Sequence, residues 1–152
     1  MTVRTSYENG VLTVTQTFDA PRQAVFDAWV ETAKTQTWWG CGDTTAVKSE
    51  IEPKVGGKYV HHMTIKHEHE TCVDGRLVAF DPPALLAYET PSAELGVTMT
   101  VRVAFVEIAA NKTEVTLTHT NIPDAFGDIV TGGWSAAFGK LRTFVEAPAS
   151  AA

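Results

Sequence analysis

The chain has 152 residues, of which 44% are hydrophobic and 20% are charged, and its formal net charge is −6. A chain of this length can bury a hydrophobic core without a metal or a disulfide, so we interpret residues 1–152 as one globular domain. The acidic balance argues against nucleic acid and anionic membranes as partners, and no stretch is apolar enough to insert into a bilayer.

The first part of the chain predicts one strand followed by two short helices. Residues 11–18 alternate β-branched and apolar side chains, which is typical of a half-buried strand. Asp19 can cap a helix and Pro21 fits its first turn, so a short helix is expected directly after the strand. Residues 32–39 predict a second short helix that ends at Gly40.

The middle of the chain predicts a run of strands, because β-prone segments alternate with turn residues such as proline, glycine and asparagine. The connections are too short for crossovers, so neighbouring strands must be antiparallel. The expected strands cover residues 44–52, 57–66, 70–80, 85–90, 97–108 and 113–120.

The end of the chain predicts a long amphipathic helix over residues 133–147, because apolar side chains recur on one helical face. This helix is the only long element available to cover the apolar face of the sheet. We therefore predict an α+β fold in which a curved antiparallel sheet of six to seven strands wraps around the C-terminal helix. The two short helices follow the first strand, and residues 148–152 are predicted to form a disordered tail.

Short motifs along the chain resemble, in their order, those of a known family. The motifs are Phe18-Asp19-Ala20-Pro21, Trp38-Trp39-Gly40, Gly56-Gly57-Lys58-Tyr59, Asp81-Pro82-Pro83, Leu117-Thr118-His119-Thr120 and Gly133-Trp134. They resemble the bacterial proteins related to the activator of heat-shock-protein-90 ATPase, within the SRPBCC (START-like) superfamily of helix-grip domains. The resemblance covers about residues 11–147. It implies a cavity between the sheet and the last helix, which binds a hydrophobic small molecule in many relatives.

One residue departs from the family pattern. Relatives usually carry proline after Trp-Trp-Gly, whereas this chain has Cys41. The sequence therefore does not predict the shape of this loop, which proline would fix in relatives. A thiol is expected at the mouth of the implied cavity.

The alternation of the predicted strands places aromatic, aliphatic and polar side chains on the inner face of the sheet. Such a surface suits an apolar ligand that carries one or two polar atoms. Trp38 and Trp39 are adjacent, so one is expected in the core and the other beside the cavity or on the surface. The candidate ligand-binding residues are Trp38, Tyr59, His61, Met63, Tyr88, His119, Trp134 and Phe138.

His61 and His119 have two interpretations, either hydrogen-bonded core residues or ligand contacts with an acid–base role. If the hairpin after residue 66 turns between His67 and Glu68, Asp74 lies opposite His61 and could orient its imidazole as a general base. A slip of one residue would turn Asp74 to solvent. The candidate catalytic residues are His61, Asp74 and His119.

The sequence does not predict a metal site or a cofactor. His62, His67, His69 and Cys72 lie close together, but their spacing matches neither structural nor catalytic zinc. Neither Cys41 nor Cys72 lies in a motif that would recruit a histidine, so both are expected to be inert thiols.

We expect a binding module rather than an enzyme, holding a hydrophobic or aromatic small molecule between the sheet and the C-terminal helix. Two cysteines and the absence of a signal peptide predict a cytoplasmic protein. Two alternatives stay open: a cyclase- or dehydratase-like enzyme with a cavity histidine and tyrosine as acid and base, and a protein that interacts with a chaperone ATPase. The oligomeric state is also open, with a homodimer as one alternative.

Overall fold

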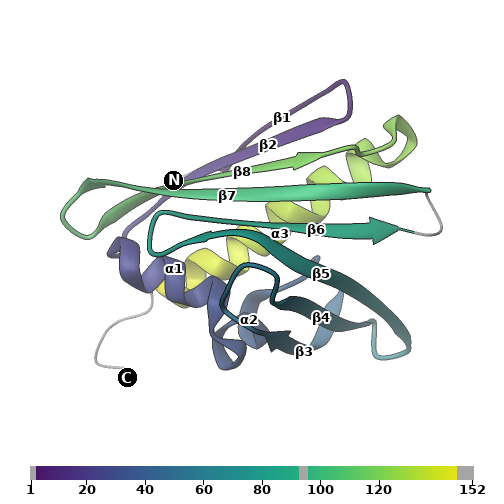
Figure 1. The fold of residues 1–152 in the computed structure, drawn as a ribbon, viewed down its shortest axis with the longest axis horizontal. Helices are drawn as coiled ribbons and strands as arrows, with labels where there is room; N and C mark the ends of the chain where they lie inside the picture. Colours follow the sequence, from purple (N-terminus) through teal and green to yellow (C-terminus); the bar gives the residue numbers. More distant parts are fainter. Residues whose placement is uncertain (1–2, 93–95, 147–152) are drawn as a thin grey trace.

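The computed structural model describes residues 3–92 and 96–146, and Figure 1 shows their arrangement. The helices are α1 (Arg22–Val30), α2 (Thr32–Trp38), the short 3-10 helix η1 (Asp124–Phe126) and α3 (Gly127–Val145). The strands are β1 (Arg4–Glu8), β2 (Val11–Phe18), β3 (Thr44–Ile51), β4 (Lys58–Ile65), β5 (His69–Asp81), β6 (Leu85–Ser92), β7 (Val97–Ala109) and β8 (Lys112–Thr120). The predicted tail at 148–152 lies outside the described residues.

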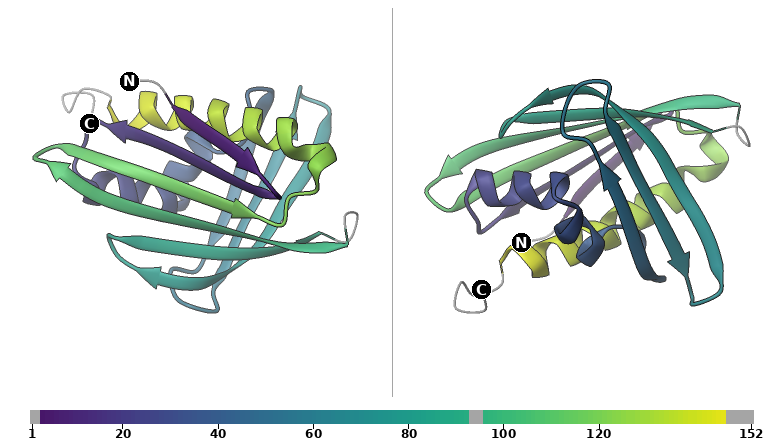
Figure 2. Two further views of the ribbon diagram at one scale, coloured as in Figure 1. Left: turned by 90° about the horizontal axis from the view of Figure 1, so that it is seen from above. Right: turned by 60° about the horizontal axis from the view of Figure 1, so that its bottom comes forward.

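The strands form one antiparallel sheet in the order β1-β2-β8-β7-β6-β5-β4-β3. Every neighbouring pair is sequential in the chain except β2 and β8, where an early strand pairs with the last strand. The sheet bends around α3, and the two short helices lie between β2 and β3 in the chain (Figure 2). The predicted α+β class and the long C-terminal helix are confirmed. Within residues 3–92 and 96–146, no helix combines the length and the apolar character needed to cross a membrane.

The sheet has eight strands rather than the six to seven that we predicted. The additional strand, β1, was missed because its residues are mostly exposed and show no apolar face. A turn signal was present, since Asn9 and Gly10 connect β1 to β2 with φ angles of 50° and 79°, and an Asn-Gly pair is the strongest short hairpin signal.

Helix α3 begins at Gly127, six residues before the predicted start at Gly133. Gly132 and Gly133 therefore lie in the helix interior, where glycine is unfavourable by about 1 kcal/mol relative to alanine. The start was misplaced because a glycine pair is typical of a helix boundary.

Of the two registers left open for the β4–β5 hairpin, the structure has the slipped one, which turns Asp74 to solvent. His61 lies opposite Val73, and Asp74 pairs with Val60. Lys66 and His67 have φ angles of 53° and 63°, so the turn centres on His67. Asp74 is exposed, and the predicted pair of His61 and Asp74 does not form.

The hydrophobic core is organised around Trp29, which lies on α1 and is 0% exposed. Its ring centroid lies between 4.7 and 6.2 Å from those of Trp38, Trp39, Phe105, Trp134 and Phe138. These rings come from α2 and the residue after it, from β7 and from α3, so one side chain joins α1, α2 and α3 to the sheet. Each aromatic pair contributes about 0.5–1.5 kcal/mol beyond the burial of its area.

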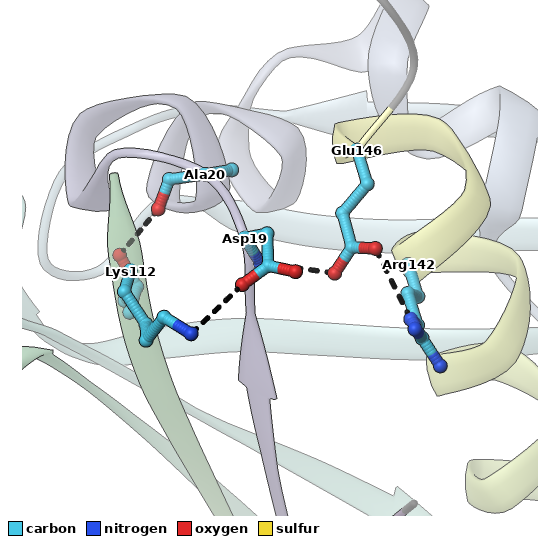
Figure 3. Close-up of polar contacts among 6 residues, drawn as sticks. Asp19, Ala20, Lys112, Arg142 and Glu146 are labelled. Atoms are coloured by element: carbon cyan, nitrogen blue, oxygen red, sulfur yellow. Dashed lines mark hydrogen bonds and ion pairs between the residues drawn. The ribbon is translucent and has the colours of Figure 1, made fainter. Parts of the chain in front are cut away.

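The C-terminal end of α3 is fastened to the start of the α1 segment by a polar network (Figure 3). The backbone N–H of Asp19 donates to the Glu146 carboxylate at 2.9 Å, and the same carboxylate accepts from Arg142 Nε at 3.1 Å. Lys112 at the start of β8 forms an ion pair with Asp19 at 3.3 Å. These contacts hold the end of α3 that lies away from the cavity described below.

Gly40 ends the α2 segment with a φ angle of +95°, and a Cβ atom there would lie 2.5 Å from Thr44 Oγ1. We expect Gly40→Ala to lower the free energy of unfolding by about 1–3 kcal/mol, because alanine must adopt a strained backbone and displace Thr44. Chemical denaturation followed by circular dichroism measures the effect.

Gly132→Ala is the matched control, since a Cβ atom added at Gly132 would have nothing within 4 Å and the residue is helical. It is expected to raise the free energy of unfolding by about 0.5–1 kcal/mol. Equal effects of the two substitutions would contradict this account of Gly40.

Candidate ligand-binding site

A cavity of about 500 Å³ lies between the inner face of the sheet and the N-terminal half of α3, and it is partly open to solvent. Strands β4 to β8 form one wall, and Trp134 and Ala137 of α3 form the other. The loop that follows α2, with Gly40 and Cys41, borders the cavity. The volume is within the range of roughly 300–1,000 Å³ that is typical of small-molecule sites.

The lining of this cavity combines apolar and aromatic side chains with uncharged polar groups. Its hydrophobic side chains include Trp39, Met63, Val73, Met99 and Val101, and its polar ones are hydroxyl, thiol and imidazole groups. Among the described residues, no aspartate, glutamate, lysine or arginine lines it. A charged ligand would therefore lose its hydration without gaining an ion pair, which is unfavourable.

His119 presents a defined hydrogen-bonding edge to the cavity. Trp134 Nε1 lies 3.0 Å from His119 Nδ1, and an indole N–H can only donate, so Nδ1 must accept. The proton of the neutral imidazole therefore resides on Nε2, which lies 3.3 Å from Met99 Sδ. Burial lowers the pKa of His119 to about 4, so the ring is neutral near pH 7.

The two buried tyrosines differ in what their hydroxyl groups contact. The Tyr59 hydroxyl donates to the Trp29 carbonyl at 2.8 Å, which makes it part of the core. Tyr88 lines the cavity, and no hydrogen bond to its hydroxyl forms among the described residues. Burial raises the pKa of Tyr88 well above its ordinary value, so the group remains a neutral phenol.

His61 lies behind the cavity wall rather than in it. Its ring stacks on Trp39 with centroids 3.7 Å apart, and its Nδ1 lies 2.8 Å from Ser49 Oγ. Thr35 extends this chain through a 2.6 Å hydrogen bond to Ser49. Burial lowers the pKa of His61 to about 3, and its Nε2 has no partner among the described residues. The ring is thus a neutral core group that supports Trp39.

The structure divides the predicted ligand-binding residues into two groups. Met63, Tyr88, His119 and Trp134 line the cavity. Trp38, Tyr59, His61 and Phe138 are fully buried in the core beside it. The two adjacent tryptophans differ accordingly, since Trp38 donates to the Ala28 carbonyl in the core and Trp39 borders the cavity.

Sequence reasoning missed several residues that shape the cavity, among them Val73, Met99 and Lys140. Met99 could have been found, because it follows the alternation of Val101 on the same strand. Lys140 does not line the cavity, but its Nζ donates to the carbonyls of Trp39 and Cys41 at 3.3 and 3.0 Å. It thereby ties the loop at the cavity mouth to α3, and partial burial lowers its pKa.

The arrangement offers hydrogen bonding and apolar contact rather than an activated base. Neither buried imidazole contacts a carboxylate among the described residues, since His61 bonds to Ser49 and His119 to Trp134. The exposed Asp74 takes no part. Within residues 3–92 and 96–146, no three histidine, cysteine, aspartate or glutamate side chains are grouped to hold a metal ion.

A sequence comparison identifies the family. The profile described as "Activator of Hsp90 ATPase homolog 1-like protein" matches residues 19–146. No curated protein matches the chain in sequence.

Solved structures with the same fold come from several bacteria. A crystal structure of a protein from Chromobacterium violaceum is 19% identical, with a TM-score of 0.83, over 91% of this chain and 99% of that one. A solution structure of a protein from Arthrobacter aurescens is 16% identical, with a TM-score of 0.84, over 98% and 94% of the two chains. A protein from Staphylococcus epidermidis is 21% identical, with a TM-score of 0.76, over 95% and 93%. At these identities the likeness shows the fold, which is of the helix-grip type.

The two buried histidines predict a loss of stability in mild acid. Both have a folded-state pKa below the ordinary value of 6.5, so the unfolded chain binds more protons between pH 6.5 and about 4. The free energy of unfolding is therefore expected to fall as the pH drops through this window, by up to about 1.4 kcal/mol per pH unit for each histidine. Urea denaturation between pH 7 and 5 measures the slope.

His119→Gln is expected to remove one histidine's share of that slope. His69→Gln serves as the control, because His69 is exposed and is expected to leave the slope unchanged. A stability that does not vary between pH 7 and 5 would contradict the assignment of both rings as neutral buried groups.

Proposed function

The chain belongs to the family of activator of Hsp90 ATPase homolog 1-like proteins, and we propose that it is a binding protein for a hydrophobic small molecule. The observation that carries this proposal is the aromatic cavity of about 500 Å³ between the sheet and α3. An engineered cavity of roughly 150 Å³ lined by apolar residues binds benzene. A space about three times larger is suited to a ligand of several rings.

The walls of the cavity support an aromatic ligand. Trp39 and Trp134 meet edge to face, with centroids 5.5 Å apart and planes at 80°. Both indoles line the cavity and are held from behind, Trp39 by His61 and Trp134 by Trp29. Walls that are already ordered favour binding, because little side-chain entropy is lost when a ligand enters.

The hydrogen-bond partners of the histidines favour binding over acid–base catalysis. A general base needs a pKa near the working pH and a partner that stabilises its protonated form. Burial instead holds the pKa of His119 at about 4, and its Nδ1 is occupied by Trp134. We therefore assign His119 to ligand contact.

Filling the cavity should abolish binding. Val73 lines the cavity on β5, and we expect Val73→Trp to weaken binding of the neutral dye N-phenyl-1-naphthylamine roughly tenfold or more, because the indole occupies the ligand's space. The fluorescence increase of the dye on titration with protein measures this binding.

The matched control is Val78→Trp on the same strand, since Val78 is 41% exposed and does not line the cavity. It should bind the dye within about twofold of the wild type. The proposed function is overturned if the dye does not bind the wild type, or if both variants bind it equally well.

A further inference from the structure

We propose that the cavity selects uncharged ligands that carry a hydrogen-bond acceptor, such as an aromatic ketone or quinone, and that His119 Nε2–H and the Tyr88 hydroxyl offer this acceptor one donor at each end of the ligand. The inference rests on the proposed function and adds the chemical class of the ligand. It follows from the charge of the cavity, from the tautomer of His119 and from the register of three strands.

The tautomer of His119 makes it a donor toward the cavity. Because Trp134 Nε1–H donates to Nδ1, the only proton of the neutral ring is on Nε2. Its present neighbour is Met99 Sδ, and a thioether is a weak acceptor on a flexible side chain. A carbonyl oxygen of a ligand would be a stronger acceptor and could displace the methionine.

The Tyr88 hydroxyl is a second polar group that a ligand could use, because it has no hydrogen-bond partner among the described residues. Tyr88 lines the cavity, and its hydroxyl is not one of the fully enclosed unpartnered atoms, which are Trp29 Nε1 and His61 Nε2. A ligand oxygen could therefore accept a hydrogen bond from this hydroxyl, or a ligand hydroxyl could donate one to it. No hydrogen bond among the described residues is broken when this hydroxyl binds a ligand.

The sheet register places these two groups at the ends of one row. His119 on β8 pairs with Val101 on β7, and Val101 pairs with Tyr88 on β6. Adjacent strands are about 4.8 Å apart, so the two backbones are separated by roughly 10 Å with Val101 between them. A planar ring system lying over Val101 can reach a polar group at either end.

The absence of charge from the described lining sets the selectivity. A carboxylate or ammonium in this cavity would be desolvated with no charged partner, whereas a ketone needs only a neutral donor. The charged side chains lie at or near the protein surface instead, because no aspartate, glutamate, lysine or arginine is buried among the described residues. Its net charge of −6 also disfavours the approach of anions.

Three probes that share one ring system test the proposal: 2-acetylnaphthalene, 2-isopropylnaphthalene and 2-naphthoate. Their affinities are measured by displacement of N-phenyl-1-naphthylamine from the full chain at pH 7. The ketone should bind about fivefold more tightly than the hydrocarbon, which is the effect of one neutral hydrogen bond. The carboxylate should bind at least roughly tenfold more weakly than the ketone.

Tyr88→Phe should reduce the preference for the ketone over the hydrocarbon about two- to fivefold without changing the affinity for the hydrocarbon. Tyr59→Phe is the control, because that hydroxyl bonds to the Trp29 carbonyl and does not face the ligand. His119→Phe should also reduce the preference for the ketone; because it removes the acceptor of the Trp134 N–H as well, only the ratio of the two affinities is compared for this variant. Thermal unfolding checks that each variant is folded.

The outcomes separate this inference from the proposed function. If ketone and hydrocarbon bind equally, if 2-naphthoate binds best, or if Tyr88→Phe and His119→Phe both keep the wild-type preference, the selectivity is wrong while a binding function stands. If neither the dye nor any neutral probe binds the wild type, the proposed function itself is overturned.

Discussion

The fold depends on the packing of Trp29 against five other aromatic rings. This cluster fixes the distance between the sheet and α3 and fills one part of the space between them. Since the rings are large and rigid, they hold the helix away from the sheet beyond the cluster as well. The cavity adjoins this cluster, because Gly133 and Ala137, which line it beside Trp134, are too small to fill the remaining space.

The same arrangement determines the chemistry of the cavity. Trp134 belongs to both regions, since its ring packs on Trp29 while its N–H bonds to His119. The core thus sets the tautomer of the imidazole that faces a ligand. Burial keeps this ring and Tyr88 uncharged. The ionic groups lie outside the cavity, where they hold elements together; the Glu146 carboxylate, for example, accepts from the Asp19 N–H at the far end of α3 (Figure 3).

Sequence patterns predicted the elements whose apolar periodicity is unbroken, which include most of the strands and the C-terminal half of α3. They did not determine the strand register where the backbone conformation of a turn sets it, as at Lys66 and His67. These residues have positive φ angles, but neither is a glycine that would have indicated such a turn in the sequence. The inward-facing residues were recognised, but their division into core and cavity was not. Whether Trp39 or His61 lines the cavity depends on how the helices pack, and no local pattern contains that information.

The central claim is that the interior consists of a solid aromatic cluster and an adjoining ligand cavity, and the tryptophan indole N–H groups report on both. Two-dimensional ¹H–¹⁵N spectra recorded during titration with 2-acetylnaphthalene test it most directly. Trp39 and Trp134 should shift strongly, whereas Trp38, whose N–H is bonded to the Ala28 carbonyl, should shift little. Unchanged spectra, or a larger shift for Trp38 than for Trp134, would contradict the account.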